Sequence, residues 1–273
     1  MPSVAKSQAL ILRTTKYGDT GLVVHAFDSV VGRCGFFLRG AGRGRNASAA
    51  AVFHPLAVVD LVCSTSGGGM PCIREFSPAL HLASLRCDVK KGAMALFISE
   101  VLYRSLHENQ PDTALFTFLT GIVGALDAAL DEAGLAQPPS VILGASEDSA
   151  LTDAPHPGAA GPGCANLHLW FLTRYAVMTG FRPTDNFGPD TPLFDPVRAM
   201  FIHPLQAGDN SFSQEDSLLL HNLLNLSVEE ALLLPLSGGR RSRFAKRMID
   251  YLSLRFEIRL DIKSLDILHE VFN

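Results

Sequence analysis

The sequence predicts an α+β protein in which a small antiparallel barrel precedes an all-helical domain. Short runs of β-compatible residues, separated by glycine-rich turns, fill the first part of the chain. Beyond residue 88, apolar residues recur instead at the i, i+3, i+4 spacing of helices. Strands that precede helices, instead of alternating with them, are typical of α+β folds or of two domains. The 273 residues, 47% of them hydrophobic, suffice for both parts.

Five strands are expected in the N-terminal part. They cover residues 8–14, 22–28, 33–38, 57–63 and 70–76, and Pro71 weakens the last of them. Five strands in about 75 residues fit the OB-fold, a five-stranded barrel. We therefore expect an OB-fold domain over residues 1–80 and a helical domain over residues 81–273, with the boundary between residues 77 and 88.

The helical domain is expected to begin with two amphipathic helices. Their apolar stripes are Met94, Phe97, Ile98, Val101 and Leu102, then Leu115, Leu119, Ile122, Val123, Leu126 and Leu130. Asp112 is placed to cap the second helix. Further stripes at residues 167–178, 244–252 and 265–272 predict later helices, with Gly180 as a C′ residue. Ser213 and Ser227, each followed three residues later by an acid, predict two more helix starts.

Two segments depart from these patterns. Residues 136–166 are rich in Ala, Gly, Pro, Ser and Asp, which predicts a mobile insertion. Residues 181–210 are irregular and contain several prolines, but Phe187, Phe194 and Phe201 are spaced through them. Those aromatic residues predict an ordered loop packed on the helices.

Composition excludes several classes of protein. The N-terminus lacks the apolar run of a signal peptide, and no stretch of about 18 apolar residues predicts a membrane span. Five cysteines without a repeated spacing make a disulfide framework unexpected. We therefore expect a cytoplasmic protein with reduced thiols.

Motifs of catalysis and of metal binding are missing from the sequence. There is no P-loop, C-x-x-C, H-E-x-x-H or G-x-S-x-G, and the nine histidines are scattered. Residues 40–44 (GAGRG) resemble a phosphate loop only loosely, and a flexible turn is the simpler interpretation. We expect no catalytic residue, no cofactor and no metal.

The net charge of −4 hides a strong asymmetry. Residues 1–50 carry seven bases against two acids, and residues 240–263 carry eight bases against three acids. Residues 51–239 between them hold 20 acids and only eight bases. Two basic ends on a slightly acidic chain indicate an acidic partner, such as nucleic acid or an acidic peptide.

The first basic block contains an arginine-rich loop. Arg39, Arg43 and Arg45 are separated only by Gly and Ala, so a thin backbone presents guanidinium groups that bind phosphates in a bidentate manner. Phe36 and Phe37 precede the loop and point to opposite faces of a strand, so one of them is a candidate platform for base stacking. The alternatives are a solvated loop and two core phenylalanines.

The second basic block lies on a predicted helix. Its basic residues are Arg240, Arg241, Arg243, Lys246 and Arg247, at helical spacing beside apolar Phe244 and Met248. A salt-sensitive site for phosphate or for an acidic peptide is the functional interpretation. An ordinary solvated helix surface is the alternative.

The order of these segments resembles a known family. The segments are ALILRTTKYGDTG, GRCGFFLRGAGRGR, FHPLAVVDLV, MPCIREF and RRSRFAKRMIDYLSLRFEIRLDIKSLDILHEVF. Each is weak alone, but together they resemble the bacterial RecO DNA repair and recombination family over most of the chain, with residues 136–166 outside the likeness.

The resemblance implies an N-terminal OB-fold, a helical C-terminal domain and a role as a recombination mediator instead of an enzyme. Such proteins bind single- and double-stranded DNA, anneal complementary strands and act with RecR. With RecR they help to load RecA onto strands covered by single-strand-binding protein. The acidic tail of that protein, which ends in Phe, docks on the helical domain of some members.

Site residues follow from the resemblance and the charge pattern together. We expect DNA contacts from Lys16, Arg33, Arg39, Arg43, Arg45, Lys90 and Lys91, and acidic-tail contacts from Arg240, Arg241, Arg243, Lys246 and Arg247. DNA binding would associate the protein with the bacterial nucleoid. The rival hypotheses are an OB-fold module that binds only acidic proteins and an enzyme with an unrecognised site.

One departure from the family concerns zinc. Many RecO-like proteins carry a four-cysteine zinc site in the helical domain, but residues 180–204 contain no cysteine, and Cys164 stands alone before them. We therefore expect no zinc, and we expect the packing of Phe187, Phe194 and Phe201 to hold this region together instead.

Overall fold

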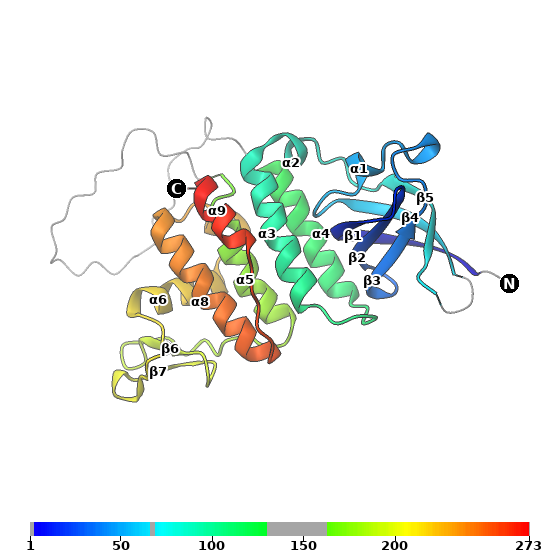
Figure 1. The fold of residues 1–273 in the computed structure, drawn as a ribbon. Coiled ribbons are helices and arrows are strands. Elements are labelled where there is room, and N and C mark those ends of the chain that lie inside the picture. The colour runs from blue at the N-terminus through cyan, green and yellow to red at the C-terminus, as the bar shows by residue number, and fades with distance from the viewer. Residues whose placement is uncertain (1–2, 66–68, 130–162, 273) are drawn as a thin grey trace.

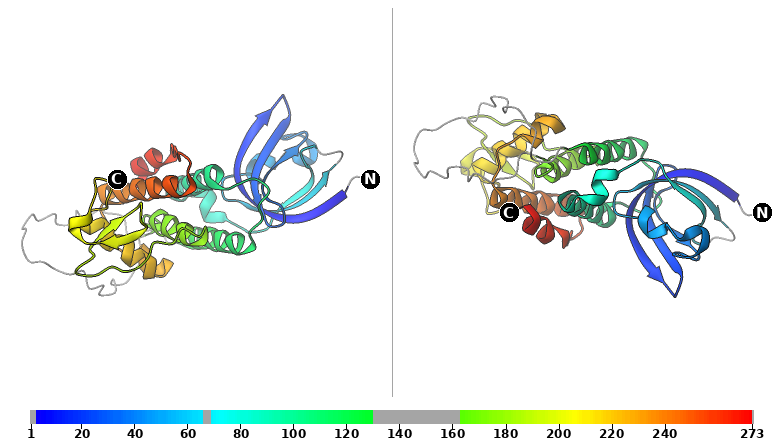
Figure 2. Two further views of the ribbon diagram at one scale, coloured as in Figure 1. Left: turned by 90° about the horizontal axis from the view of Figure 1, so that it is seen from below. Right: turned by 90° about the horizontal axis from the view of Figure 1, so that it is seen from above.

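The computed structural model describes residues 3–65, 69–129 and 163–272. A barrel lies at one end of an elongated molecule, and a helical domain extends away from it (Figures 1 and 2). Most of the insertion predicted at residues 136–166 falls outside the described residues. Within the described ranges, no helix is both long enough and apolar enough to cross a membrane.

Five strands close the N-terminal barrel in the order β1-β2-β3-β5-β4. They are β1 (Ser3–Tyr17), β2 (Gly21–Asp28), β3 (Gly32–Leu38), β4 (Val58–Thr65) and β5 (Cys72–Pro78). Neighbouring strands are antiparallel except β3 and β5, which meet in a short parallel pairing at Phe37 and Cys72. The five-stranded barrel predicted from the sequence is confirmed, although β1 is longer at both ends than expected.

Strand β1 serves two hydrophobic cores. Ala9 and Ile11 point into the barrel, whereas Leu10 and Leu12 pack with the helices, and all four are buried. A register shift after Ile11 interrupts the pairing with β2. Because alternate side chains of one strand belong to different cores, the barrel cannot separate from the helices without exposing Leu10 and Leu12.

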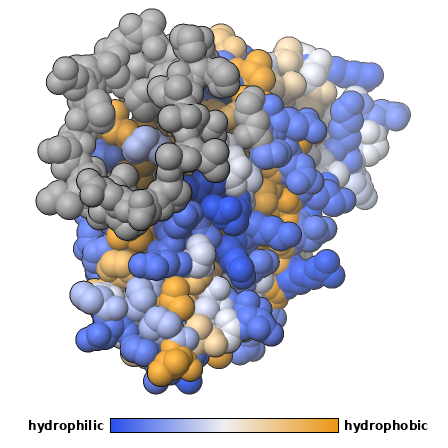
Figure 3. Space-filling model, turned by 90° about the vertical axis from the view of Figure 1, so that its left-hand side faces the viewer, coloured by the Kyte–Doolittle hydropathy of each residue, from blue (hydrophilic) through white to orange (hydrophobic). Residues whose placement is uncertain are grey.

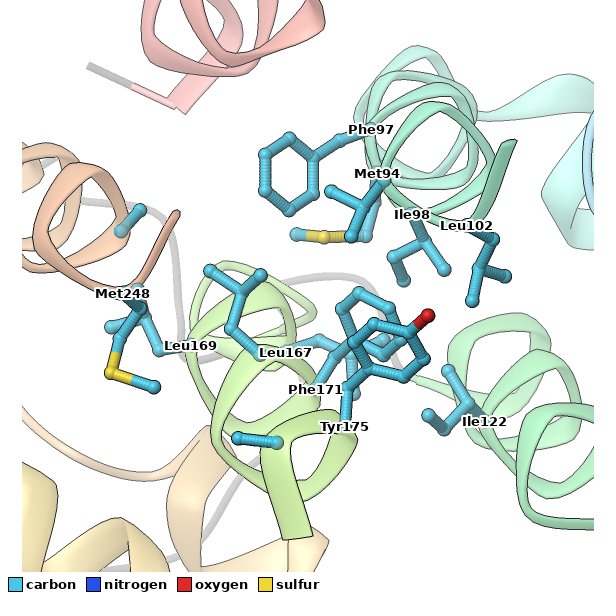
Figure 4. Close-up of a cluster of buried hydrophobic side chains, with 14 of the residues drawn as sticks. Met94, Phe97, Ile98, Leu102, Ile122, Leu167, Leu169, Phe171, Tyr175 and Met248 are labelled. Carbon is cyan, nitrogen blue, oxygen red and sulfur yellow. The ribbon is translucent and has the colours of Figure 1, made fainter. Parts of the chain in front are cut away.

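The helical domain is built around a core of facing helices. These are α2 (Ala83–Cys87), α3 (Val89–Ser105), α4 (Thr113–Ala128), α5 (Leu167–Met178), α6 (Gln214–Asn225), α7 (Val228–Leu232), α8 (Gly238–Phe256) and α9 (Ser264–Phe272). Figure 4 shows Phe171 and Tyr175 of α5 lying among side chains of α3 and α4. The Tyr175 hydroxyl is buried and lies 2.7 Å from Ser105 Oγ on α3. This pair satisfies two polar groups inside an otherwise apolar core.

The helix starts follow the predicted caps. Asp112 accepts a hydrogen bond from the Leu115 N–H, and Ser213 accepts one from the Asp216 N–H. Ser227 and Glu230 form a reciprocal capping box. Each cap satisfies backbone donors that a helix end leaves without a partner. The caps predicted at Asp112, Ser213 and Ser227 are therefore confirmed.

Residues 181–210 form an ordered loop that contains a short hairpin of β6 (Leu193–Asp195) and β7 (Met200–Ile202). Phe194 and Phe201 are buried with ring centroids 5.3 Å apart, and Phe187 lies 5.3 Å from Phe201. Asn186 fixes the hairpin by hydrogen bonds with both the N–H and the carbonyl of Phe201. The predicted packing of the three phenylalanines is confirmed, whereas the two short strands were not predicted.

The barrel docks on the helices through the β2–β3 turn. The Asn109 N–H donates a hydrogen bond of 2.9 Å to the Arg33 carbonyl. A Cβ on Gly32 would lie 2.4 Å from the backbone of Gln110, and Gly32 has a φ of +79°. Only glycine permits this approach, so the turn fixes the barrel against the α3–α4 connection.

Candidate nucleic-acid interface

The arginine-rich loop after β3 is held in shape by hydrogen bonds. Asn46 Nδ2 donates to the Arg39 carbonyl at 2.6 Å, and the Gly42 N–H donates to the Asn46 carbonyl at 2.9 Å. Gly40, Gly42 and Gly44 all have positive φ, which L side chains rarely adopt. The loop is therefore a turn held by hydrogen bonds.

This loop lies against the β1–β2 hairpin. The Ala41 N–H donates a hydrogen bond of 2.8 Å to the Thr20 carbonyl at the tip of that hairpin. Arg39 and Arg43 on the loop and Lys16 on the hairpin are exposed, and no described residue forms an ion pair with them. Asp19 is the single acid in residues 16–21 and 39–46. The result is a barrel end that carries unneutralised positive charge. The side chain of Arg45 falls outside the described part of the structure.

An aromatic pair lies beside these cations. Phe36 is 3% exposed and points into the barrel, whereas Phe37 points outward and is half-buried. The ring of Tyr17 meets Phe37 edge to face at 5.7 Å and is 66% exposed. The opposite orientation of the two phenylalanines is confirmed. The exposed ring of this aromatic pair, however, is Tyr17, which was not among the candidates from the sequence.

The same outer face of the barrel continues towards the helices. Arg13 on β1 is exposed, and its guanidinium lies 5.5 Å from the ring centroid of Tyr103 on α3. His25 is paired with Arg13 across the strands and meets Tyr103 edge to face at 5.3 Å. Burial, then Arg33 and Arg13, lower the pKa of His25 below its usual range. Sequence reasoning missed this cluster because Tyr103 is far from Arg13 in the chain.

Arg33 does not face outward, contrary to the prediction that it extends the DNA track. Its Nη1 donates to the Leu106 carbonyl at 3.1 Å and lies 3.7 Å from a Glu108 carboxylate oxygen. Its guanidinium also stacks 4.7 Å from the Tyr103 ring centroid. Arg33 therefore joins the barrel to the helices, and its side chain is not presented to a phosphate.

Lys91 is also buried, contrary to the prediction that it contacts DNA. It is 3% exposed, and its ammonium donates to Ser84 Oγ and to the carbonyls of Asp127 and Ala129 at 2.9 and 2.6 Å. These oxygens include carbonyls at the end of α4, where a cation stabilises the helix dipole. Lys91 holds α3, α2 and α4 together. Lys90 is half-buried beside it and stays a prediction.

The second basic run is largely engaged within the protein. Arg241 donates to the carbonyls of Leu236 and Phe272 at 2.6 and 2.7 Å, which fastens the end of α9 to α8. Arg240 donates to the Glu215 carbonyl at 3.2 Å. Arg241 therefore has a structural role, contrary to the prediction that it binds an acidic tail.

Two acids of α6 lie close to Arg243, which is also at the start of α8. Arg243 lies 3.7 Å from a carboxylate oxygen of Glu215 and 3.7 Å from one of Asp216. Lys246 is exposed and Arg247 half-buried, and neither has an ion pair among the described residues. The exposed face at this end of the molecule is mostly hydrophilic, with small groups of apolar residues (Figure 3).

A groove of about 700 Å³ runs between α8 and α9 near Lys246. Its charged lining residues are Lys246, Arg259, Asp250, Glu257, Asp261 and Asp266. Four carboxylates against two bases disfavour an acidic peptide in this groove. The described residues contain no cluster of His, Cys, Asp and Glu able to hold a metal ion.

Fold and surface together define a class of protein. It has a five-stranded barrel of the OB type, a basic and aromatic surface at the barrel end, and a helical domain fixed to it. A family model described as "Recombination protein O N terminal" matches residues 1–79, and one described as "Recombination protein O C terminal" matches residues 86–137.

Relatives match along nearly the whole chain. The DNA repair protein RecO of Flavobacterium psychrophilum is 26% identical over 98% of this chain and 99% of its own length. The DNA repair protein RecO of Christiangramia forsetii is 25% identical over 97% and 98%, respectively. That of Bacteroides fragilis is 26% identical over 98% and 99%. The chain belongs to the RecO family of DNA repair proteins.

Proposed function

We propose that this protein is a non-enzymatic recombination mediator that binds DNA through the end of its barrel. The observation that carries the proposal is the group of exposed cations Lys16, Arg39 and Arg43, which have no ion pair with a described residue, beside the exposed ring of Tyr17. Phosphate contacts from Lys and Arg supply most of the affinity of such a surface and make it sensitive to salt. An exposed aromatic ring adds base stacking that is independent of sequence.

The loop suits a phosphate backbone because its arginines project from a path fixed by hydrogen bonds. A guanidinium donates two parallel hydrogen bonds to one phosphate, and a fixed loop loses little entropy on binding. Tyr17 then supports a base of the same strand, while Arg13 and Tyr103 continue the surface towards α3.

Strand annealing follows from charge neutralisation. Two complementary strands repel each other through their phosphates, and cations that bind both strands lower this repulsion. Bases supported on one face then meet their complements, and no covalent bond forms or breaks. Membership of the RecO family supports this activity and also supports cooperation with RecR in loading RecA onto strands covered by single-strand-binding protein. The protein would act in the bacterial cytoplasm, at the nucleoid.

Fewer basic residues are available to bind the acidic tail of single-strand-binding protein than the sequence indicated. Lys246 and Arg247 are the two bases of the α8 run that have no ion pair among the described residues. Replacing both with Gln is expected to weaken binding of a synthetic acidic peptide ending in Phe, measured by fluorescence anisotropy. Unchanged peptide affinity would place the tail elsewhere.

Annealing of complementary oligonucleotides tests the main proposal. We expect the Arg39→Ala/Arg43→Ala variant to anneal more slowly than the natural protein and to bind single strands more weakly. The matched control is Arg198→Ala/Arg259→Ala, which removes two exposed arginines of the helical domain. Equal annealing by all three proteins would contradict the proposal. If single-stranded DNA fails to bind at all while acidic proteins do bind, the chain is an OB-fold module for acidic proteins instead.

A further inference from the structure

Two adjoining pockets lie where the barrel meets the helices. One has a volume of about 270 Å³ and the other about 220 Å³, and both are lined by Ala51, His54 and Arg86. They lie between α1 (Ala49–Val52), which follows the arginine-rich loop almost directly, and α2. Figure 1 shows α1 and α2 at the same edge of the molecule. We call the two together the junction pocket.

The junction pocket is lined mainly by apolar residues, and the few ionisable residues among them are all basic. Its ionisable residues are His54, His81 and Arg86, and no described carboxylate lines either part. Arg86 is exposed and has neither a hydrogen bond nor an ion pair with any residue that the structure describes. The Ser48 hydroxyl, which also lines the pocket, does not cap α1. Unused donors around a cation are the chemistry that binds an oxyanion.

Two acids on neighbouring elements bind helix backbone and do not line the junction pocket. Asp88 accepts hydrogen bonds from the backbone N–H groups of Lys90 and Lys91 at the start of α3. Asp127 accepts one from the Leu85 N–H at 2.6 Å. Both carboxylates thus face helix backbone, and neither is among the residues that line the junction pocket.

The protonation of His54 is expected to depend on whether an anion occupies the pocket. Its Nδ1 lies 3.1 Å from the Pro55 carbonyl, so Nδ1 carries the proton and Nε2 is the remaining ring nitrogen. Burial lowers the pKa of His54, the hydrogen bond to Pro55 opposes that effect, and Arg86 lowers the pKa further. An anion in the pocket would favour the protonated ring, whose Nε2–H then donates a second hydrogen bond.

We propose that the junction pocket binds a phosphate of the DNA backbone, with Arg86 as the cationic contact and Ser48, His54 and His81 as donors around it. The inference rests on the proposed DNA-binding function and extends it, because it continues the path of a strand from Arg43 over α1 to the helical domain. The DNA surface then spans both domains, which the fixed joint at Gly32 keeps in one arrangement.

The salt dependence of binding tests this inference. Fluorescence anisotropy with a labelled oligothymidylate gives the slope of log affinity against log salt for each variant. One lost phosphate contact lowers the magnitude of that slope by about 0.7 on a single strand, and we expect this change for Arg86→Gln. The matched control is Arg198→Gln, an exposed arginine on the β6–β7 turn, which is expected to leave the slope unchanged.

The outcomes separate this inference from the function on which it rests. If Arg86→Gln keeps the natural slope and affinity while Arg39→Ala/Arg43→Ala reduces them, the junction pocket is not a phosphate site and the proposed function stands. If neither variant changes the slope, both proposals are wrong.

Nuclear magnetic resonance of the His54 ring distinguishes the source of the phosphate. With ¹⁵N-labelled protein, we expect oligothymidylate to shift the His54 ring signals and Arg86→Gln to abolish the shift. Inorganic phosphate at the same phosphate concentration is expected to have a smaller effect. Ring signals that move with inorganic phosphate but not with the oligonucleotide would overturn the proposal.

Discussion

The arginine-rich loop and the start of α8 carry similar charge but use it differently. On the loop, Arg39 and Arg43 are exposed without an ion pair among the described residues. On α8, Arg241 binds two carbonyls, and Arg243 faces the carboxylates of Glu215 and Asp216. A count of basic residues therefore does not separate a binding surface from a structural one.

Local backbone explains the difference. Glycines with positive φ turn the loop back on itself, and the carbonyls of Arg39, Gly40 and Arg43 accept hydrogen bonds from the Asn46 side chain and from backbone N–H groups. Among the described residues, the side chains of Arg39 and Arg43 consequently have no hydrogen-bonded acceptor. On α8 the opposite holds, because the end of α9 and the first turn of α6 present acceptors to Arg241 and Arg243.

The largest effect is expected for Arg241→Ala. Hydrogen bonds to a charged donor contribute about 1.5–3 kcal/mol each, and this variant loses two in a half-buried site. We expect the free energy of unfolding to fall by about 3 kcal/mol, measured by chemical denaturation. Arg39→Ala is the control and is expected to change stability by less than about 0.5 kcal/mol. Equal losses would remove the structural distinction between the two regions.

A pH effect is expected next to Arg241. His168 is fully buried, and burial, followed by Arg241, lowers its pKa from 6.5 to about 3. The unfolded chain therefore binds more protons than the folded protein between about pH 3 and pH 6.5, so stability falls as pH decreases through this window. The slope due to this one group approaches about 1.4 kcal/mol per pH unit.

His168→Leu isolates that contribution. We expect the variant to lose less stability than the natural protein between pH 7 and pH 5, when both are measured by thermal and chemical denaturation. The same pH dependence in both proteins would show that His168 is not the group that titrates.

A somewhat smaller effect on stability is expected for Lys91→Met. The change removes the ammonium group, which donates hydrogen bonds to three oxygens. It leaves the carbonyls of Asp127 and Ala129 without this donor. An unsatisfied buried acceptor costs about 1–3 kcal/mol, so we expect a loss of about 2 kcal/mol in the free energy of unfolding. The affinity of the folded variant for single-stranded DNA is expected to stay unchanged. A selective loss of affinity would return Lys91 to the DNA surface.

The smallest effect is expected for the aromatic platform. Tyr17→Ala removes an exposed ring and is expected to weaken binding of single-stranded DNA by about 1 kcal/mol, the lower end of the range for base stacking. Tyr17→Phe keeps the ring and is the matched control. Because stacking is not a charge contact, the salt slope of Tyr17→Ala should equal that of the natural protein. If the salt slope of Tyr17→Ala is reduced while Tyr17→Phe binds single-stranded DNA normally, Tyr17 has a role other than base stacking.

Much of the fold was predictable because it depends on local patterns. The five strands and the helix caps at Asp112, Ser213 and Ser227 follow from periodicity and from hydrogen bonds within a few residues. Helices α1 and α2 and the β6–β7 hairpin were missed because elements of three to five residues are too short to show a period.

The site was predictable only in part. The exposure of Arg39 and Arg43 follows from a glycine-rich loop, which keeps side chains away from the core. Lys91 and Arg241 were misassigned because each also binds a carbonyl that lies far away in the chain, by 36 and 31 residues, respectively. Tertiary packing decides whether a basic side chain binds a ligand or its own backbone.

Salt dependence of single-strand binding, measured on two matched double variants, tests the central comparison most directly. For Arg39→Ala/Arg43→Ala we predict that the slope of log affinity against log salt falls in magnitude by about 1.4, or about 0.7 for each lost contact. For Arg240→Ala/Arg243→Ala we predict an unchanged slope. A reduced slope for the α8 variant together with a natural slope for the loop variant would contradict the account.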